Sequence, residues 1–178
     1  MSDLRYPIGP VSEFPRDSYN DRHEYVEFIG AFPQLMKEKT QGLRPDALRL
    51  PYRPDGWSIL QVVHHCADSH LNAYTRFRLA LTEYRPHIRP YQEHLWAQLA
   101  DAVHPDLTPS LQILSGVHCR WHQLLESMTE ADWNRTYLHP EYKDEYNLLD
   151  ALAQYVWHGK HHLGHIDQAL RFQESFPL

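Results

Sequence analysis

The stretch SILQVVHHCADSHLNAYTRFRLA, residues 58–80, decides the fold. It opens with Ser58 and Gln61, the two residues of a capping box, in which each side chain satisfies a backbone N–H group at the start of a helix. Core-type residues then recur at spacings of four and three: Ile59, Val63, Cys66, His70, Ala73, Phe77 and Ala80. This spacing is typical of the seam of a helical bundle, so we predict a long helix that ends before Pro86.

Three further long helices are predicted along the chain. The first covers residues 21–41 and contains Pro33, which should kink it. Another covers residues 108–128, with a leucine-rich apolar stripe. The last begins near Asn147, which is a good N-cap residue. Four long helices with proline-marked connections predict an all-α four-helix bundle, either up-and-down or with a crossover connection.

The remaining segments are predicted to be short elements. Residues 1–20 contain three prolines and are expected to form an extended N-terminal arm. A shorter helix is predicted at 92–103 and a capped turn at 129–133. The stretch 136–146 is rich in turn and polar residues and allows a short hairpin. We expect residues 1–178 to form a single domain.

Composition excludes several classes of protein. The chain has 178 residues, of which 42% are hydrophobic and 22% charged, and its net charge of −6 argues against a nucleic-acid-binding face. Residues 1–20 do not resemble a signal peptide, and no apolar run is long enough to cross a membrane. Cys66 and Cys119 are expected to be buried free thiols. We therefore expect a cytoplasmic protein with no nucleic-acid or membrane partner.

Histidine is unusually frequent, with 14 copies, and it is the commonest metal ligand in proteins. Three pairs lie four residues apart in predicted helices: His158 and His162, His161 and His165, and His118 and His122. This spacing places two imidazoles one above the other, which suits two ligands of one metal ion. The pattern favours the first pair but leaves the other two pairs, and the absence of any metal, as alternatives.

A polar stripe follows the seam of the helix that begins at Ser58. It consists of His65, Ser69, Asn72 and Arg76, spaced by four, three and four residues. Such a stripe could line a pocket, or it could be the solvated flank of an amphipathic helix. His70 lies on the apolar side and is interpreted as a core residue.

Two motifs resemble those of the DinB/YfiT-like family. Residues 55–77 contain the first, DGWS followed by VVHHCADSH and RF, and residues 155–166 contain the second, YVWH followed by His162, His165 and Ile166. Residues 6–9, 89–91 and 137–140 are also similar to the YfiT branch. The resemblance spans nearly the whole chain and implies a four-helix bundle and a homodimer.

The same resemblance implies one zinc or nickel ion per chain, held by His65, His158 and His162. Members of the YfiT branch are described as metal-dependent hydrolases, and relatives are thiol S-transferases that use bacillithiol. The implied function is therefore a metal-dependent enzyme acting on a small molecule, a hydrolase or a transferase of a low-molecular-weight thiol. The pair formed by His118 and His122 is not part of the family pattern and is interpreted as a surface or packing feature.

Three neutral imidazoles leave the charge of a metal ion uncompensated and at least one coordination position open, as in catalytic sites. Such an ion can activate water or a thiol. Asp68 is a candidate to orient a ligand, His161 and His165 are candidates for proton transfer, and Arg76 is a candidate anchor for a substrate carboxylate. The alternative is a metal-binding stress or interaction protein without turnover, which a fourth protein ligand would favour.

Overall fold

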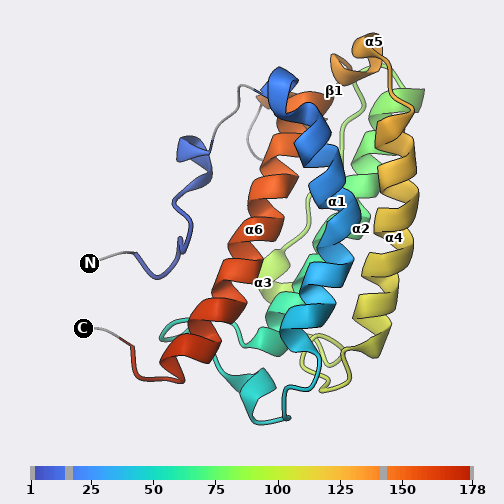
Figure 1. Cartoon of the computed structure of the whole chain (residues 1–178). Coiled ribbons are helices and arrows are strands. Elements are labelled where there is room, and N and C mark those ends of the chain that lie inside the picture. The colour runs from blue at the N-terminus through green and yellow to red at the C-terminus, as the bar shows by residue number, and fades with distance from the viewer. Residues whose placement is uncertain (1–2, 15–17, 141–143, 177–178) are drawn as a thin grey trace.

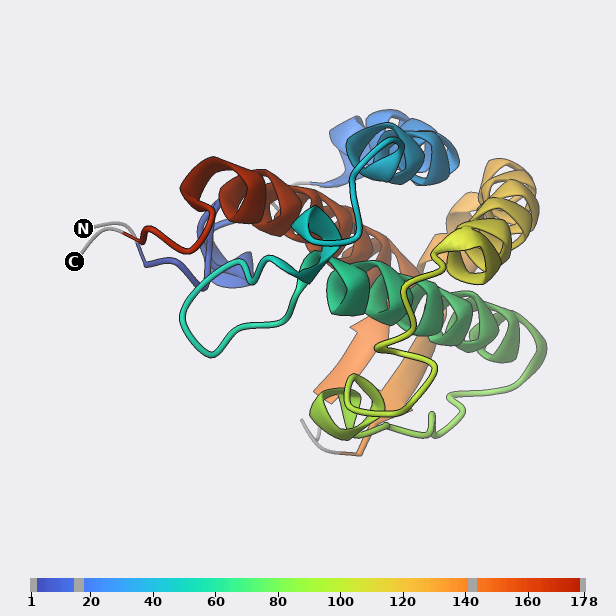
Figure 2. The same ribbon diagram turned by 90° about the horizontal axis from the view of Figure 1, so that it is seen from below.

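The computed structural model describes residues 3–14, 18–140 and 144–176 of the chain. Its main elements are four long helices: α1 (Ser18–Thr40), α2 (Ile59–Thr82), α4 (Thr108–Glu126) and α6 (Leu148–Phe172). Both α1 and α2 pack against α4 and α6, so that α1 and α2 lie diagonally across the bundle (Figure 1, Figure 2). The predicted all-α four-helix bundle is confirmed, and its topology is a crossover one, because α2 and α4 run in the same direction (Figure 1).

Short elements occupy the connections between the long helices. They are η1 (Val11–Glu13), η2 (Ala47–Arg49), α3 (Glu93–Trp96), α5 (Glu130–Trp133), and the antiparallel strands β1 (Thr136–His139) and β2 (Asp144–Asn147). The hairpin contacts α2 and α6, and a parallel bridge joins His87 to Leu138 of β1. The residues that follow α2 are therefore held beside the hairpin, and α3 comes later in the same connection.

The predicted caps define where two of the long helices begin. The Ser58 side chain accepts a hydrogen bond from the Gln61 backbone N–H, and the Gln61 side chain accepts one from the Ser58 N–H at 3.0 Å. At the start of α6, Asn147 accepts a bond from the backbone N–H of Asp150 at 2.7 Å. Such caps stabilise a helix by about 1 kcal/mol each. They also set the positions of the histidines along α2 and α6.

The apolar core consists of two clusters. Phe77 of α2 and Val156 of α6 belong to the cluster near the hairpin, whereas Val63 and Ile166 belong to the cluster at the other end. Between the two clusters, three of the long helices carry histidines that are buried or half-buried: His70 on α2, His118 on α4, and His158 and His162 on α6. The bundle therefore contains a polar layer across its middle.

The prediction of a helix over residues 92–103 is wrong, because only α3 forms there. The following residues make turns with bonds between residues three apart, such as the one from the Leu99 N–H to the Trp96 carbonyl at 3.0 Å. Within this stretch only Ala97 and Ala102 are buried. Two small side chains provide too little apolar surface to hold a longer helix against the bundle.

Other local expectations had mixed outcomes. Cys66 is buried as expected, but Cys119 is exposed, because it lies on the face of α4 away from the fully buried Trp121. The first helix begins at Ser18 and continues through Pro33 to Thr40.

No helix among the described residues is long and apolar enough to span a membrane. The homodimer stays a prediction.

Candidate metal centre

Three histidines from two helices bring nitrogen atoms to one place. His65 comes from α2, and His158 and His162 come from successive turns of α6, where their ring centroids lie 4.5 Å apart. One ring nitrogen from each residue lies within 4.8 Å of those from the other two. The Nε2 atoms of His65 and His158 are 3.1 Å apart. The structure thus brings together the three residues that the two sequence motifs single out.

The arrangement fits a divalent transition-metal ion. Tetrahedral zinc with bonds of about 2.0–2.1 Å holds its nitrogen ligands roughly 3.3 Å apart, close to the 3.1 Å between the two Nε2 atoms. Burial lowers the pKa of His65 to about 4, and it lowers the pKa values of His158 and His162 well below their usual range. All three imidazoles are therefore neutral at pH 7, the form that binds metals.

A chain of buried imidazoles leads from His158 across the bundle. The Nδ1 atom of His158 lies 3.0 Å from Nε2 of His70, and Nδ1 of His70 lies 2.7 Å from Nε2 of His118. The chain ends at α1, where Nδ1 of His118 lies 2.6 Å from the carbonyl oxygen of Ile29. Pro33 explains why this carbonyl is available: proline has no N–H group, so the carbonyl four residues earlier lacks its usual helical donor.

A second, shorter chain leads from His162 to the N-terminal arm. The Nδ1 atoms of His162 and His165 lie 3.3 Å apart, and Nε2 of His165 lies 3.2 Å from the carbonyl oxygen of Arg5. His158 and His162, the two residues that α6 contributes to the candidate centre, therefore both use Nδ1 for a hydrogen bond to another histidine. Each chain ends at a backbone carbonyl.

Aromatic rings and the N-terminal arm cover one side of the centre. Trp57 packs on His65 with ring centroids 4.7 Å apart, and Tyr52 stacks on His165 at 3.7 Å. The side-chain amide of Gln168 donates to one carbonyl in the arm and to one in the segment before α2, at 2.8 and 2.7 Å. These contacts hold both segments against α6 and shield the histidines from water.

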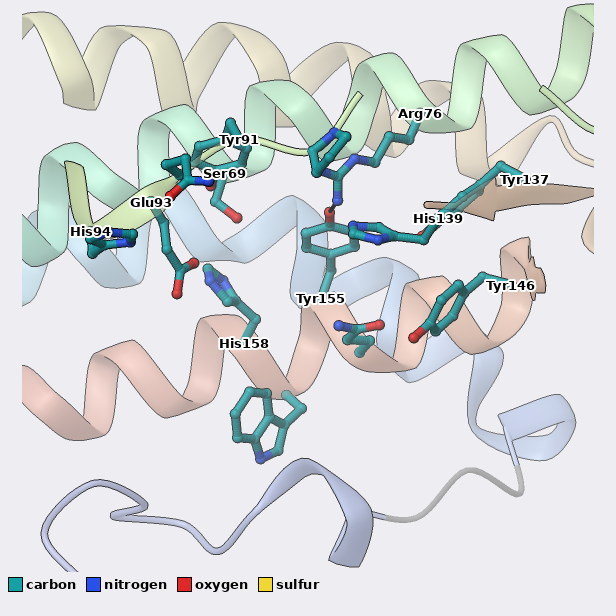
Figure 3. A pocket seen from close by; sticks show the side chains of 14 residues that line it. Ser69, Arg76, Tyr91, Glu93, His94, Tyr137, His139, Tyr146, Tyr155 and His158 are labelled. Carbon is teal, nitrogen blue, oxygen red and sulfur yellow. Dashed lines mark hydrogen bonds between the residues drawn. The ribbon is translucent and has the colours of Figure 1, made fainter. Parts of the chain in front are cut away.

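A pocket of about 310 Å³ reaches His158 from the side of the hairpin (Figure 3). Its walls come from α2, α6, the hairpin and the segment that leads into α3, and they include Ser69, Arg76, Tyr91, Glu93, Tyr137 and Tyr155. The volume lies at the lower end of the range for small-molecule sites. The candidate centre therefore borders a polar chamber that is large enough for a small ligand.

Arg76 places a cation in the wall of this pocket. Its side chain reaches from α2 to Tyr155 of α6, and Nη1 donates to the Tyr155 hydroxyl at 2.9 Å (Figure 3). Its Nε atom is buried without a hydrogen-bond partner in the part of the chain that the structure describes, and no ion pair there includes this guanidinium. A buried donor without an acceptor is costly and needs an explanation.

Comparison with known proteins identifies the family. The model of the DinB superfamily matches residues 31–166. This chain belongs to the DinB superfamily. It is 39% identical over 169 residues to the Bacillus subtilis protein named "Putative metal-dependent hydrolase YfiT", covering 95% of both chains. A Bacillus licheniformis protein with the same descriptive name is 46% identical over 171 residues, which cover 93% of this chain and 94% of that one.

The structural comparison agrees with the sequence comparison. The solved structure of YfiT from Bacillus subtilis, described as having an unusual four-helix bundle topology, matches this DinB superfamily chain with a TM-score of 0.91. The match covers 97% of this chain and 98% of that one at 39% identity. The diagonal placement of α1 and α2 therefore belongs to a bundle arrangement that the two proteins share.

The other predicted site residues of this DinB superfamily member have different surroundings. His165 lies in the cluster and uses both ring nitrogens in hydrogen bonds. His161 stacks on Trp157 with centroids 4.4 Å apart, and its buried Nδ1 has no hydrogen-bond partner among the described residues. Burial, followed by the charge of Asp101, raises the pKa of Asp68. Within the described ranges no hydrogen bond joins the Asp68 carboxylate to the clustered histidines, and its role in orienting a ligand stays a prediction.

Sequence reasoning missed His70 and His118 as parts of the site. Both are fully buried and link the centre to α1, whereas His122, which we grouped with His118, lies 3.5 Å from Glu27 and 3.3 Å from Glu126 near the surface. A signal was present in the sequence. His118 follows Leu114 by four residues and precedes Trp121 by three, so it occupies the buried seam of α4.

The surface group is a weaker metal candidate. Glu27, His122 and Glu126 also offer ligand atoms within 4.8 Å of one another, but both glutamates are exposed. Acidic side chains often gather on a protein surface without an ion. The three histidines, by contrast, are buried or half-buried and neutral at pH 7, and a pocket reaches one of them.

Proposed function

We propose that this chain is a metal-dependent enzyme in which one zinc or nickel ion, held by His65, His158 and His162, activates water or a low-molecular-weight thiol. The observation that carries the proposal is the convergence of three neutral imidazoles, of which His158 also lines a pocket. The names of the relatives support hydrolase activity.

The charges of the side chains support a catalytic role. The next partners of the α6 histidines, His70 and His165, are imidazoles rather than carboxylates, and their lowered pKa values keep them neutral, so they add no net charge. Bound there, a divalent ion with such neutral ligands would supply Lewis acidity that lowers the pKa of water or of a thiol toward neutral pH. Burial raises the pKa of the Cys66 thiol, which makes this cysteine a poor nucleophile. In this proposal the nucleophile comes from solution.

Arg76 is proposed to bind a carboxylate of the substrate or of the thiol. A guanidinium presents several N–H groups in a plane that matches a carboxylate. Such a ligand would give the buried Nε–H group the acceptor that it lacks among the described residues. This observation favours thiol transfer as a second candidate reaction, because low-molecular-weight thiols such as bacillithiol carry carboxylates.

A reaction panel separates the two chemistries. Metal-loaded protein is incubated with a chromogenic electrophile and, in turn, with cysteine, glutathione, bacillithiol or no thiol. Metal-dependent cleavage of an ester or amide without thiol supports hydrolysis, whereas product that requires both metal and thiol supports transfer. Absence of turnover in every combination, with one ion bound per chain, would support the non-catalytic metal-binding alternative.

The role of Arg76 is tested with N-acetylcysteine and its amide, which differ only in the carboxylate. Arg76→Gln should raise the KM for the acid about 10- to 100-fold, the range expected for losing a charged hydrogen-bond pair, and leave that for the amide nearly unchanged. Arg78→Gln, on the exposed face of the same helix, is the matched control. Equal effects of Arg76→Gln on both thiols would contradict carboxylate binding.

A further inference from the structure

We propose that two chains of neutral imidazoles, each anchored on a backbone carbonyl, set the tautomers of His158 and His162 so that their Nε2 lone pairs face the metal. In this proposal His70, His118 and His165 are positioning residues. The inference concerns how the chain prepares its ligands before any ion binds. It holds whichever reaction the centre performs.

The donors and acceptors of the longer chain can be assigned from its far end. The carbonyl oxygen of Ile29 can only accept, so Nδ1 of His118, 2.6 Å away, carries a hydrogen. A neutral imidazole has one N–H group, so Nε2 of His118 is an acceptor. It therefore receives a bond from Nδ1 of His70, 2.7 Å away. The same step repeats at 3.0 Å, where Nε2 of His70 receives the bond from Nδ1 of His158.

This assignment determines the state of the ligand atom. Because the single hydrogen of His158 lies on Nδ1, its Nε2 atom carries a lone pair. The Nε2 atom of His65 lies 3.1 Å away and can donate its hydrogen to that lone pair in the metal-free protein. The ordered chain thus extends over four imidazoles from α1 to the centre, and the hydrogen bonds between them are mutually compatible.

The shorter chain follows the same rule. The carbonyl oxygen of Arg5 accepts from Nε2 of His165 at 3.2 Å, which leaves Nδ1 of His165 as an acceptor. The hydrogen on Nδ1 of His162, 3.3 Å away, fills that position and leaves Nε2 of His162 with a lone pair. Two unrelated segments, the arm and α1, therefore impose the same tautomer on both α6 ligands.

Pro33 supplies the acceptor on which the longer chain depends. In an uninterrupted helix the N–H group of residue 33 would bond to the carbonyl of Ile29. Proline leaves that carbonyl for His118, which reaches it from α4. A residue that disfavours helix interiors thus provides the fixed end of a hydrogen-bond chain inside the bundle.

Imidazole nitrogen NMR tests the assignment directly in the metal-free protein. With 15N-labelled histidine at pH 7.5, the expected N–H positions are Nδ1 for His118, His70, His158 and His162, and Nε2 for His165. Detection of the Nε2–H tautomer at His158 or His162 would overturn the proposal. This measurement uses the unmodified chain and needs neither a substrate nor an activity.

Metal affinity tests the consequence of the assignment. Removing a partner that orients a metal-ligating histidine typically weakens metal binding about 10- to 100-fold. His118 acts on His158 only through His70, so we expect His118→Phe to weaken Zn²⁺ binding in a competition titration by about 10-fold, the lower end of that range. His118→Gln should recover most of the affinity, because its amide can donate to Ile29 and accept from His70. His122→Phe, one turn along the same helix, is the control and should bind Zn²⁺ normally.

The variants are compared by circular dichroism first, so that only folded proteins enter the titration. If His118→Phe does not fold, the pair His165→Phe and His165→Gln tests the shorter chain in the same way. Unchanged Zn²⁺ affinity in a folded phenylalanine variant would overturn the positioning role. Equal losses in the phenylalanine and glutamine variants would also overturn it, since packing rather than hydrogen bonding would then matter.

Discussion

Acidification from pH 7 to pH 5 should destabilise the metal-free protein, because it protonates histidines of the unfolded chain that stay neutral in the folded one. His118 is fully buried, and burial lowers its pKa from 6.5 to about 4. In the unfolded chain this pKa returns to about 6.5. Between the two values the unfolded chain binds a proton that the folded chain does not bind, so the free energy of unfolding falls as the pH falls. The stabilisation is complete above pH 6.5 and is lost toward pH 4.

The magnitude follows from these two pKa values. One such group lowers the free energy of unfolding by about 2 kcal/mol between pH 7 and pH 5. Burial also lowers the pKa of His65 to about 4, and this histidine adds a second loss of the same sign. Typical domains are stable by only about 5–15 kcal/mol. Urea unfolding in the presence of a chelator, followed by circular dichroism at pH 7, 6 and 5, measures the change.

A variant assigns one part of this pH dependence to His118. His118→Gln cannot take up the proton, so its free energy of unfolding should depend less on pH. Between pH 4 and pH 6.5 its slope should be smaller than that of the unmodified chain by up to about 1.4 kcal/mol per pH unit. Equal stability of the unmodified protein at pH 7 and pH 5 would refute the reasoning, and so would an unchanged slope in His118→Gln.

Two further predictions concern the ligands and the packing of α6. His162→Ala should abolish stoichiometric metal binding in elemental analysis, and His122→Ala should keep one ion per chain; the reverse result would move the site to the surface group. At Gly159 an added Cβ would lie 3.0 Å from the ring of Phe32. Overpacking in Gly159→Ala should therefore destabilise the protein by about 1–3 kcal/mol. The higher helix propensity of alanine should offset up to about 1 kcal/mol of this loss. Gly116→Ala, where a Cβ meets nothing within 4 Å, should show only that gain in urea unfolding; a lower stability there would contradict the comparison.

The helices could be predicted because their signals are local. The capping box at Ser58 and the N-cap at Asn147 involve residues that lie three apart, and the apolar seams repeat within each helix. The helix that was predicted at 92–103 and does not form shows the limit of this reasoning. Its apolar residues had the right local spacing, but whether a helix forms there depends on what the rest of the chain offers as a packing surface.

The candidate centre needed more than local signals. Helix spacing left three histidine pairs as alternatives, and only the resemblance of two motifs selected His65 with the α6 pair. The link between His70 and His118 joins residues 48 positions apart, and it forms only because α2 and α4 pack together. The pocket likewise needs the hairpin to stand beside α2 and α6. Such relationships follow from topology, which single-helix patterns do not contain.

Burying several imidazoles in the middle of an apolar bundle requires that each nitrogen have a role, because an unpaired buried polar atom is costly. Carboxylates would satisfy the N–H groups, but they would also neutralise part of the charge of a bound ion. Backbone carbonyls satisfy the same donors without a net charge. By ending its histidine chains on Ile29 and Arg5, this protein would orient two ligands of the proposed ion without reducing the charge of that ion. Pro33, which the sequence pattern marks only as a kink, is one source of that arrangement.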